Sequence, residues 1–177
     1  MKQKEYANLK GMCSCQAGKI HGIETTEWGP HYWKTLHKLS LRAGTLSLPN
    51  AQAEEMRSWT HILRETQKAI PCEDCRSHYK EWILANPLKP LLDAPYAEKG
   101  EWIRDWLWRL HSDVNRRLGK PNLDFSELTA TYASVFVRFE IATIDKYIRV
   151  ATVASQIKLL DFKEWKKHVV ILNSMYY

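Results

Sequence analysis

The chain of 177 residues is about one domain long, and its hydrophobic content of 45% suffices for a packed core without disulfide cross-links. No stretch approaches the roughly 18 uninterrupted apolar residues of a membrane span, and residues 1–5 lack the apolar region of a signal peptide. The net charge of +6 comes from Lys and Arg scattered among Asp and Glu, which does not favour a nucleic-acid partner. We therefore expect a globular domain with no membrane span and no bound nucleic acid.

The first 26 residues contain three glycines and no apolar period, so we predict a flexible N-terminal arm. This arm carries Cys13 and Cys15, and the only other cysteines are Cys72 and Cys75. Four cysteines are too few for a disulfide scaffold, and they fall into two close pairs. This pairing indicates a separate task for each pair.

Helical periodicity begins near Trp28. One face of the first predicted helix consists of Tyr32, Leu36, Leu39 and Ala43. A second helix follows the cap at Leu48-Pro49-Asn50 and keeps its apolar period up to Pro71. The third runs from Cys72 to the stop at Asn86-Pro87, which makes about four turns. The first half of the chain thus predicts three helices joined by short links.

The second half also reads as helical. After a proline-rich loop, residues 103–118 form the clearest amphipathic helix, which ends at Gly119. A fifth helical stretch starts at Asp124 or Ser126 and continues toward Val150. A capping box of Asp161 and Glu164 predicts the start of a final helix. Because strand signals are absent, the fold class that we predict is all-α, a helix bundle.

The pair Cys72-x-x-Cys75 lies at a proline-marked helix start, a setting that suits electron transfer. Unpaired backbone N–H groups and the partial positive charge of a helix N-terminus lower a cysteine pKa, so Cys72 is expected to be the more reactive thiol. The spacing alone is also compatible with half of a zinc site or with two thiols of no special function. All three interpretations stay open at this point.

Polar rings and amides lie on two helical stripes that face the expected interior. Trp33 and His37 are four residues apart, and His111, Asn115 and Leu118 follow at the spacing i, i+4 and i+7. Each unpaired buried polar group costs about 1 to 3 kcal/mol, and a planar polar cofactor would satisfy all of these groups. The alternative is that His37 and His111 are core or rim histidines with protein partners.

Three motifs in chain order carry a family resemblance. They are Trp28-Gly29-Pro30-His31-Tyr32-Trp33-Lys34-Thr35-Leu36-His37, then Pro71-Cys72-Glu73-Asp74-Cys75, then His111-Ser112-Asp113-Val114-Asn115-Arg116-Arg117-Leu118-Gly119-Lys120-Pro121. Over roughly residues 28–136 the chain resembles the Erv/ALR family of FAD-linked sulfhydryl oxidases, most of all its viral members. The resemblance implies a four-helix bundle with a short fifth helix, FAD at the mouth of the bundle and a homodimer. It divides the chain into an arm (1–26), an oxidase domain (27–137) and a helical C-terminal extension (138–177).

The resemblance also implies a role for individual residues. Cys75 would lie against the isoalloxazine ring, and Cys72 would be the outer sulfur that exchanges with incoming thiols. The residues that it implies for FAD binding are Gly29, Trp33, His37, Cys75, His78, His111, Asn115, Leu118, Lys120 and Tyr132. Lys120 also makes independent physical sense, because the two phosphates of FAD need cationic or N–H partners.

The implied reaction converts two thiols and dioxygen into a disulfide and hydrogen peroxide, with reduced protein thiols or a thioredoxin-like carrier as the electron donor. We hypothesise that Cys13 and Cys15 form a shuttle disulfide that passes electrons to Cys72. The rival interpretation is a structural zinc module with Cys13, Cys15, Cys72 and Cys75 as four thiolate ligands, although CxC is a tight spacing for zinc. Without a leader, the expected location is the host cytoplasm or a virion for a viral protein, and the mitochondrial intermembrane space otherwise.

Overall fold

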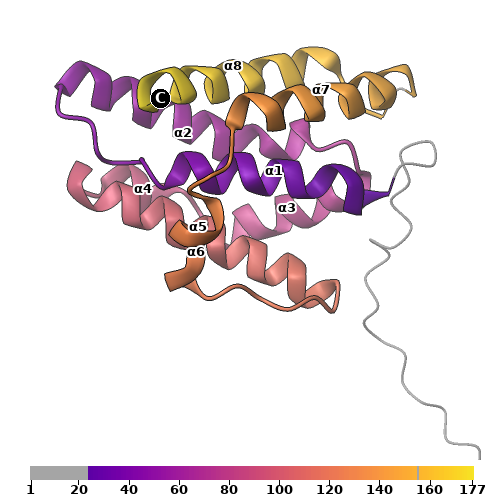
Figure 1. Ribbon diagram of the computed structural model, residues 1–177, viewed down its shortest axis with the longest axis horizontal. Coiled ribbons are helices and arrows are strands. Elements are labelled where there is room, and N and C mark those ends of the chain that lie inside the picture. Colours follow the sequence, from indigo (N-terminus) through magenta and orange to yellow (C-terminus); the bar gives the residue numbers. More distant parts are fainter. Residues whose placement is uncertain (1–23, 155) are drawn as a thin grey trace, which may run out of the picture.

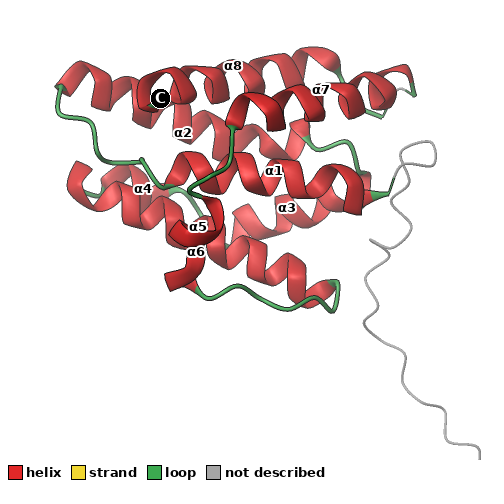
Figure 2. Cartoon of the chain, in the orientation of Figure 1, coloured by secondary structure: helices red, strands yellow, loops and turns green. Residues whose placement is uncertain are grey.

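The computed structural model describes residues 24–154 and 156–177, which are helical apart from turns and connections and contain no strand (Figure 2). The bundle consists of α1 (Thr25–Ser40), α2 (Pro49–Ala69), α3 (Glu73–Ala85) and α5 (Tyr96–Arg117), with the short helices α4 (Lys89–Asp93), η2 (Phe125–Glu127) and α6 (Leu128–Tyr132). The C-terminal extension adds α7 (Val137–Val153) and α8 (Leu159–Tyr176). The predicted all-α fold is confirmed.

The helices form layers around α1 and α2 (Figure 1). On one side of this pair, α5 packs on α1 and α3 packs on α2, and on the other side α7 packs on α1 and α8 on α2. The apolar stripe of α1 is buried as its period predicts, from Tyr32 and Leu36 through Leu39 to Ala43. No helix of the described part of the chain is long and apolar enough to cross a membrane.

The C-terminal extension shares the hydrophobic core with the bundle. Trp165 of α8 is fully buried, and its indole Nε1 donates a hydrogen bond to Oγ1 of Thr66 in α2 over 2.9 Å. Trp59 of α2 donates in the same way to the hydroxyl of Tyr176 over 2.9 Å, and that hydroxyl donates to the buried carboxylate of Glu55. Because these polar groups satisfy one another across α2 and α8, the two helices are fixed in register.

Some helices begin earlier than predicted, because their first turns are set by capping residues and not by the apolar period. α1 begins at Thr25, three residues before Trp28, because Glu24 and Glu27 form a capping box; the predicted boundary between arm and oxidase domain therefore lies inside α1. α5 begins at Tyr96, behind the N-cap Pro95, about two turns before the apolar stripe that starts at Ile103. The five-residue helix α4 has no apolar period to reveal it.

Two expectations for the C-terminal half are wrong. The fifth helical stretch is not continuous, because α6 ends at Tyr132 and α7 begins only after the N-cap Phe136. The capping box of Asp161 and Glu164 does not form, because α8 begins at Leu159 and Asp161 lies within its first turn. A capping box that was not predicted, of Asp124 and Glu127, forms at the start of η2.

Candidate active site

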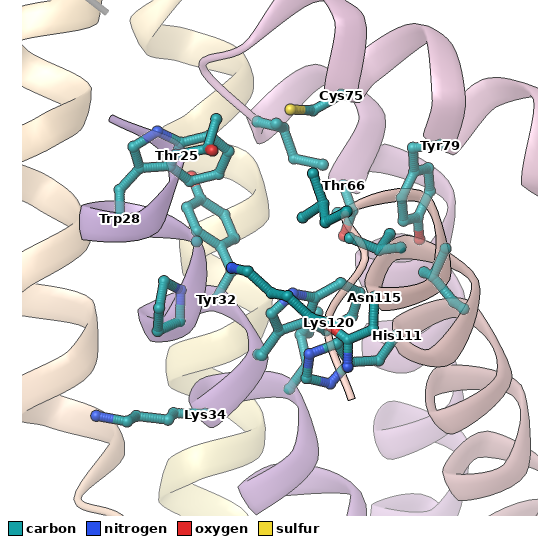
Figure 3. Close-up of a pocket in the computed structure, with 18 of the residues that line it drawn as sticks. Thr25, Trp28, Tyr32, Lys34, Thr66, Cys75, Tyr79, His111, Asn115 and Lys120 are labelled. Atoms are coloured by element: carbon teal, nitrogen blue, oxygen red, sulfur yellow. The ribbon is translucent and has the colours of Figure 1, made fainter. Parts of the chain in front are cut away.

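A cavity of about 430 Å³ opens between the start of α1, the end of α2, α3, the second half of α5 and α6. Figure 3 shows Cys75 at one end of it and His111, Asn115 and Lys120 at another, with Trp28 and Tyr32 along the α1 side. The volume falls within the range of ligand sites, and the lining is mostly aromatic and aliphatic with a few polar groups, which is typical of cofactor pockets.

Stacked rings form one wall of the cavity. The indole of Trp33 lies parallel to the imidazole of His111, with ring centroids 4.1 Å apart and an interplanar angle of 9°. His37 lies behind them, with its Nε2 3.0 Å from Nδ1 of His111 and its ring stacked on Tyr132 at 4.6 Å. This wall presents flat ring surfaces to the cavity. At its back, Nε2 of His37 is paired with His111, whereas the buried Nδ1 of His37 has no hydrogen-bond partner among the described residues.

Burial holds both histidines of this wall in the neutral state. Burial and the neighbouring His111 lower the pKa of His37 to about 3, and burial together with the Lys120 ammonium lowers the pKa of His111 to about 4. The contact between Nε2 of His37 and Nδ1 of His111 is then a hydrogen bond between neutral rings, in which one nitrogen donates and the other accepts.

Cys72 and Cys75 form a disulfide across the N-terminus of α3, with their Cα atoms 5.2 Å apart. Cys72 is the N-cap, and its Sγ accepts a hydrogen bond of 3.2 Å from the backbone N–H of Cys75. Cys75 is partly exposed and lines the cavity, whereas Cys72 is only 4% exposed. Cys75 is therefore the sulfur of the pair that faces the cavity, and the role of Cys72 as the outer sulfur stays a prediction.

The connection between α7 and α8 lies close to the segment that enters α3. Nη1 of Arg76 donates to the carbonyl oxygens of Ile70 and Gln156, at 3.0 and 2.9 Å, and so ties that connection to the segment that enters α3. Figure 1 shows this connection, the start of α1 and the α2–α3 link at the same end of the molecule. A contact between residues so far apart in the chain leaves no signal in local periodicity.

His78 reaches the cavity from α3 and is held from behind by α5. Its Nε2 lies 2.8 Å from Oδ2 of Asp113, and Arg117 also bonds this carboxylate, at 3.2 Å. Burial lowers the pKa of His78 despite the bond to Asp113. Burial alone would raise the pKa of Asp113, but the bond to His78 and the charge of Arg117 lower it overall. A neutral imidazole thus donates from Nε2 to a carboxylate, which leaves Nδ1 free of its proton.

Three features of the cavity point to a ligand. The indole Nε1 of Trp28 is buried and has no hydrogen-bond partner among the described residues, and a Cβ added at Gly29 would meet no atom within 4 Å. Three cationic side chains, Lys34, Arg117 and Lys120, line the same cavity. The site therefore offers an unused donor, open space against a helix backbone and positive charge for an anionic group.

Comparison with known proteins assigns the chain to a family. The model of the Erv1 / Alr family matches residues 30–133, more than half of the chain. The chain belongs to the Erv1 / Alr family. The match ends before α7, so α7 and α8 lie outside the region that the family model covers.

Individual relatives are consistent with this assignment. A protein of African swine fever virus named "FAD-linked sulfhydryl oxidase" is 29% identical over 118 residues, which cover 67% of this chain and 87% of the relative. The rice protein "FAD-linked sulfhydryl oxidase ERV1" is 26% identical over 118 residues, 66% of this chain and 55% of its own length. The baker's yeast protein "Mitochondrial FAD-linked sulfhydryl oxidase ERV1" is 27% identical over 107 residues, 60% and 50% of the two chains. No solved structure matches significantly.

The residues that the Erv1 / Alr resemblance singled out converge on the cavity. The lining includes Gly29, Trp33, Cys75, His78, His111, Asn115, Leu118, Lys120 and Tyr132. His37 does not line it but supports His111 and Tyr132 from behind. Cys13 and Cys15 lie outside the described residues.

Sequence reasoning missed several residues of the site. Trp28, Tyr32 and Thr66 line the cavity, and Asp113 orients His78. The spacing of Trp28 and Tyr32 on the α1 stripe was visible as a core pattern, but nothing in it indicates a cavity. Asp113 could have been found only by knowing that α3 and α5 meet at this point.

Metal binding finds no support in this arrangement. Among the described residues there is no group of three or more His, Cys, Asp and Glu that could hold a metal ion. Cys72 and Cys75, two of the four ligands of the zinc alternative, are joined to each other in the disulfide. A sulfur in a disulfide does not provide the thiolate that zinc requires.

Proposed function

We propose that this chain is an FAD-dependent sulfhydryl oxidase, which oxidises protein thiols to disulfides through Cys72 and Cys75 and passes the electrons to dioxygen, giving hydrogen peroxide. The observation that carries the proposal is the disulfide itself: its Cys75 lines the same cavity as the stacked wall of Trp33 and His111. Membership of the Erv1 / Alr family, whose relatives are named for this chemistry, supports it.

The residues of the cavity are suited to FAD. Flat rings of Trp33, His111 and Tyr132 supply surfaces for a planar ring system, and the open space at Gly29 allows close approach to α1. Lys120 and Arg117 supply positive charge for a diphosphate. Bound there, FAD supplies a two-electron acceptor that dioxygen reoxidises.

The chain's own residues perform the thiol exchange. A substrate thiolate attacks Sγ of Cys72, a new S–S bond forms, and the bond to Cys75 breaks so that Cys75 leaves as a thiolate on the cavity side. A second substrate thiolate then displaces Cys72, which completes the substrate disulfide and leaves both cysteines reduced. The N–H of Cys75 and the start of α3 stabilise the negative charge on Cys72.

Proton handling falls to His78. Its Nδ1 can take up a proton at the cavity because Asp113 keeps the other ring nitrogen protonated. Together with the two electrons from the cysteine pair, the protons given up by the two substrate thiols balance the formation of hydrogen peroxide from dioxygen.

The partners follow the same resemblance. Reduced protein thiols or a thioredoxin-like carrier would supply electrons, with Cys13 and Cys15 as the shuttle pair, and the protein would act as a homodimer. Any dimer contact has to lie outside the faces of α1 and α2 that α7 and α8 cover. A Cys13→Ser/Cys15→Ser variant should oxidise dithiothreitol at the normal rate but protein thiols more slowly. Equal rates on reduced protein would remove the shuttle.

The visible spectrum of the purified full chain is the decisive test. We expect flavin bands that survive desalting and bleach with dithiothreitol under argon. Cys72→Ser and Cys75→Ser form a matched pair, and both should abolish bleaching. Only Cys75→Ser should shift the flavin bands, because of the two cysteines Cys75 is the one that lines the cavity. A colourless protein with stoichiometric zinc would overturn the proposal.

A further inference from the structure

A second cavity, of about 680 Å³, lies between the end of α2, the outer face of α3 and the connection from α7 to α8. Its described lining carries side chains of both signs, with Lys68, Arg76, Lys80 and Lys158 against one carboxylate, that of Asp161. We call it the basic groove. Its size is sufficient for a short polypeptide segment.

The positive charge of the basic groove is only partly neutralised. Lys68 pairs with Glu65, 2.6 Å from its Nζ, but Lys80 and Lys158 form no ion pair with any residue that the structure describes. The N-terminus of α8 adds a partial positive charge at Lys158 and Leu159. The groove therefore favours a negatively charged occupant.

The basic groove is adjacent to the disulfide. Arg76 lines the groove, and the residue directly before it in the chain, Cys75, lines the first cavity. The same Arg76 donates to the carbonyl of Ile70, two residues before Cys72. A polypeptide lying in the groove would thus have its neighbouring residues close to the segment that carries Cys72 and Cys75.

One wall of the basic groove belongs to this chain's extension. The lining residues of this wall lie beyond the region that the family model matches, which ends at residue 133; they are Thr152, Gln156, Ile157, Lys158, Leu159 and Asp161. The extension thus adds positive charge, from Lys158, to the disulfide end of the molecule.

We propose that the basic groove binds an acidic segment next to the reacting cysteine of the substrate protein, and so selects which thiols reach Cys72. The selection of substrate thiols rests on the proposed function, but binding of the acidic segment does not depend on oxidase activity. The occupant is a polypeptide with Asp or Glu close to a cysteine.

Binding is measured by fluorescence anisotropy with a fluorescein-labelled peptide that carries several glutamates around a serine in place of the cysteine. A peptide with glutamines instead of the glutamates is the matched probe. The full chain should prefer the glutamate peptide, and Lys80→Glu/Lys158→Glu should weaken its binding about tenfold, since two attractions become repulsions. Asp161→Asn should strengthen binding of the glutamate peptide, whereas a loss of folding would weaken it.

Lys163→Glu is the control. Lys163 is an exposed lysine of α8 outside the groove, and its replacement by Glu changes the net charge as much as each single groove substitution does. The proposal would be overturned if the full chain bound the two peptides equally. It would also be overturned if Lys163→Glu weakened binding as much as Lys80→Glu or Lys158→Glu alone. Near-ultraviolet circular dichroism of each variant checks that the fold is retained.

Turnover then separates the groove from the oxidase. With cysteine-containing versions of the two peptides, Lys80→Glu/Lys158→Glu should lower kcat/KM for the acidic peptide while the rate with dithiothreitol stays the same. Loss of the dithiothreitol rate in the unaltered chain would refute the proposed oxidase and leave the anisotropy result standing. Raising the salt to about 1 M, where the screening length falls to roughly 3 Å, should abolish the preference.

Discussion

At the level of single residues, His37 and His111 make stability depend on pH. Their pKa values in the folded protein are lowered to about 3 and about 4, from about 6.5 in an unfolded chain. At pH values between the folded and the unfolded pKa, the unfolded state binds more protons than the folded one, so the free energy of unfolding falls as the pH decreases. We expect a loss of about 1.4 kcal/mol per pH unit for each histidine below pH 6.

Urea denaturation of the flavin-free protein at pH 7 and pH 5 measures this loss. His37→Gln should make the pH dependence shallower by about one histidine's share, because a glutamine does not titrate. An unchanged slope in this variant would show that other groups, such as His78 and His168, carry the acid sensitivity.

Gly29 is the second residue whose replacement is informative. It lies within α1, where alanine is favoured over glycine by up to about 1 kcal/mol, and a Cβ there meets no atom within 4 Å. Gly29→Ala should therefore raise the stability of the flavin-free chain, yet reduce flavin retention if the cofactor uses the open space. Absorbance after desalting and urea denaturation measure the two effects, and full retention of flavin would show that the space is not used.

At the level of elements, the turn after α1 and the helix α5 are in backbone contact. A Cβ added at Gly100 of α5 would lie 2.1 Å from the carbonyl oxygen of Ala43, and Gly44 in the turn has a φ of 75°. Neither backbone can yield without moving the helix, so Gly100→Ala should destabilise the fold by about 3 kcal/mol or more despite its better helix propensity. Thermal unfolding measures this, with Gly29→Ala as the comparison; a stability equal to the unaltered chain would contradict the close approach.

Elements with a strong apolar stripe were predictable from the sequence, and the rest were not. The periods of α1, α2 and the second half of α5 mark buried faces that the structure confirms. The start of α5 and the break before α7 depend on Pro95 and on packing rather than on hydrophobic spacing. At the site, the ring and cysteine motifs were visible, but the burial of Cys72 and the contact of His78 with Asp113 arise between elements far apart in the chain.

At the level of the whole molecule, α7 and α8 replace solvent on one entire face of α1 and α2. Trp59, Ile62 and Leu63 of α2 are fully buried in a core that also contains Trp165, Val169 and Leu172 of α8. Removal of the extension would expose this apolar face and leave Glu55 without the hydroxyl of Tyr176.

A chain that ends at residue 133, the limit of the family match, should therefore lose cooperative unfolding and aggregate, although it retains every residue that lines the first cavity. Circular dichroism melting and sedimentation of this truncated chain beside the full chain measure the effect. A truncated chain that stays folded and sediments as a dimer would contradict this expectation, because it would show that a second copy can cover the face of α1 and α2. Aggregation, with a single cooperative transition in the full chain, would show instead that the extension is part of the same folding unit as the cavity.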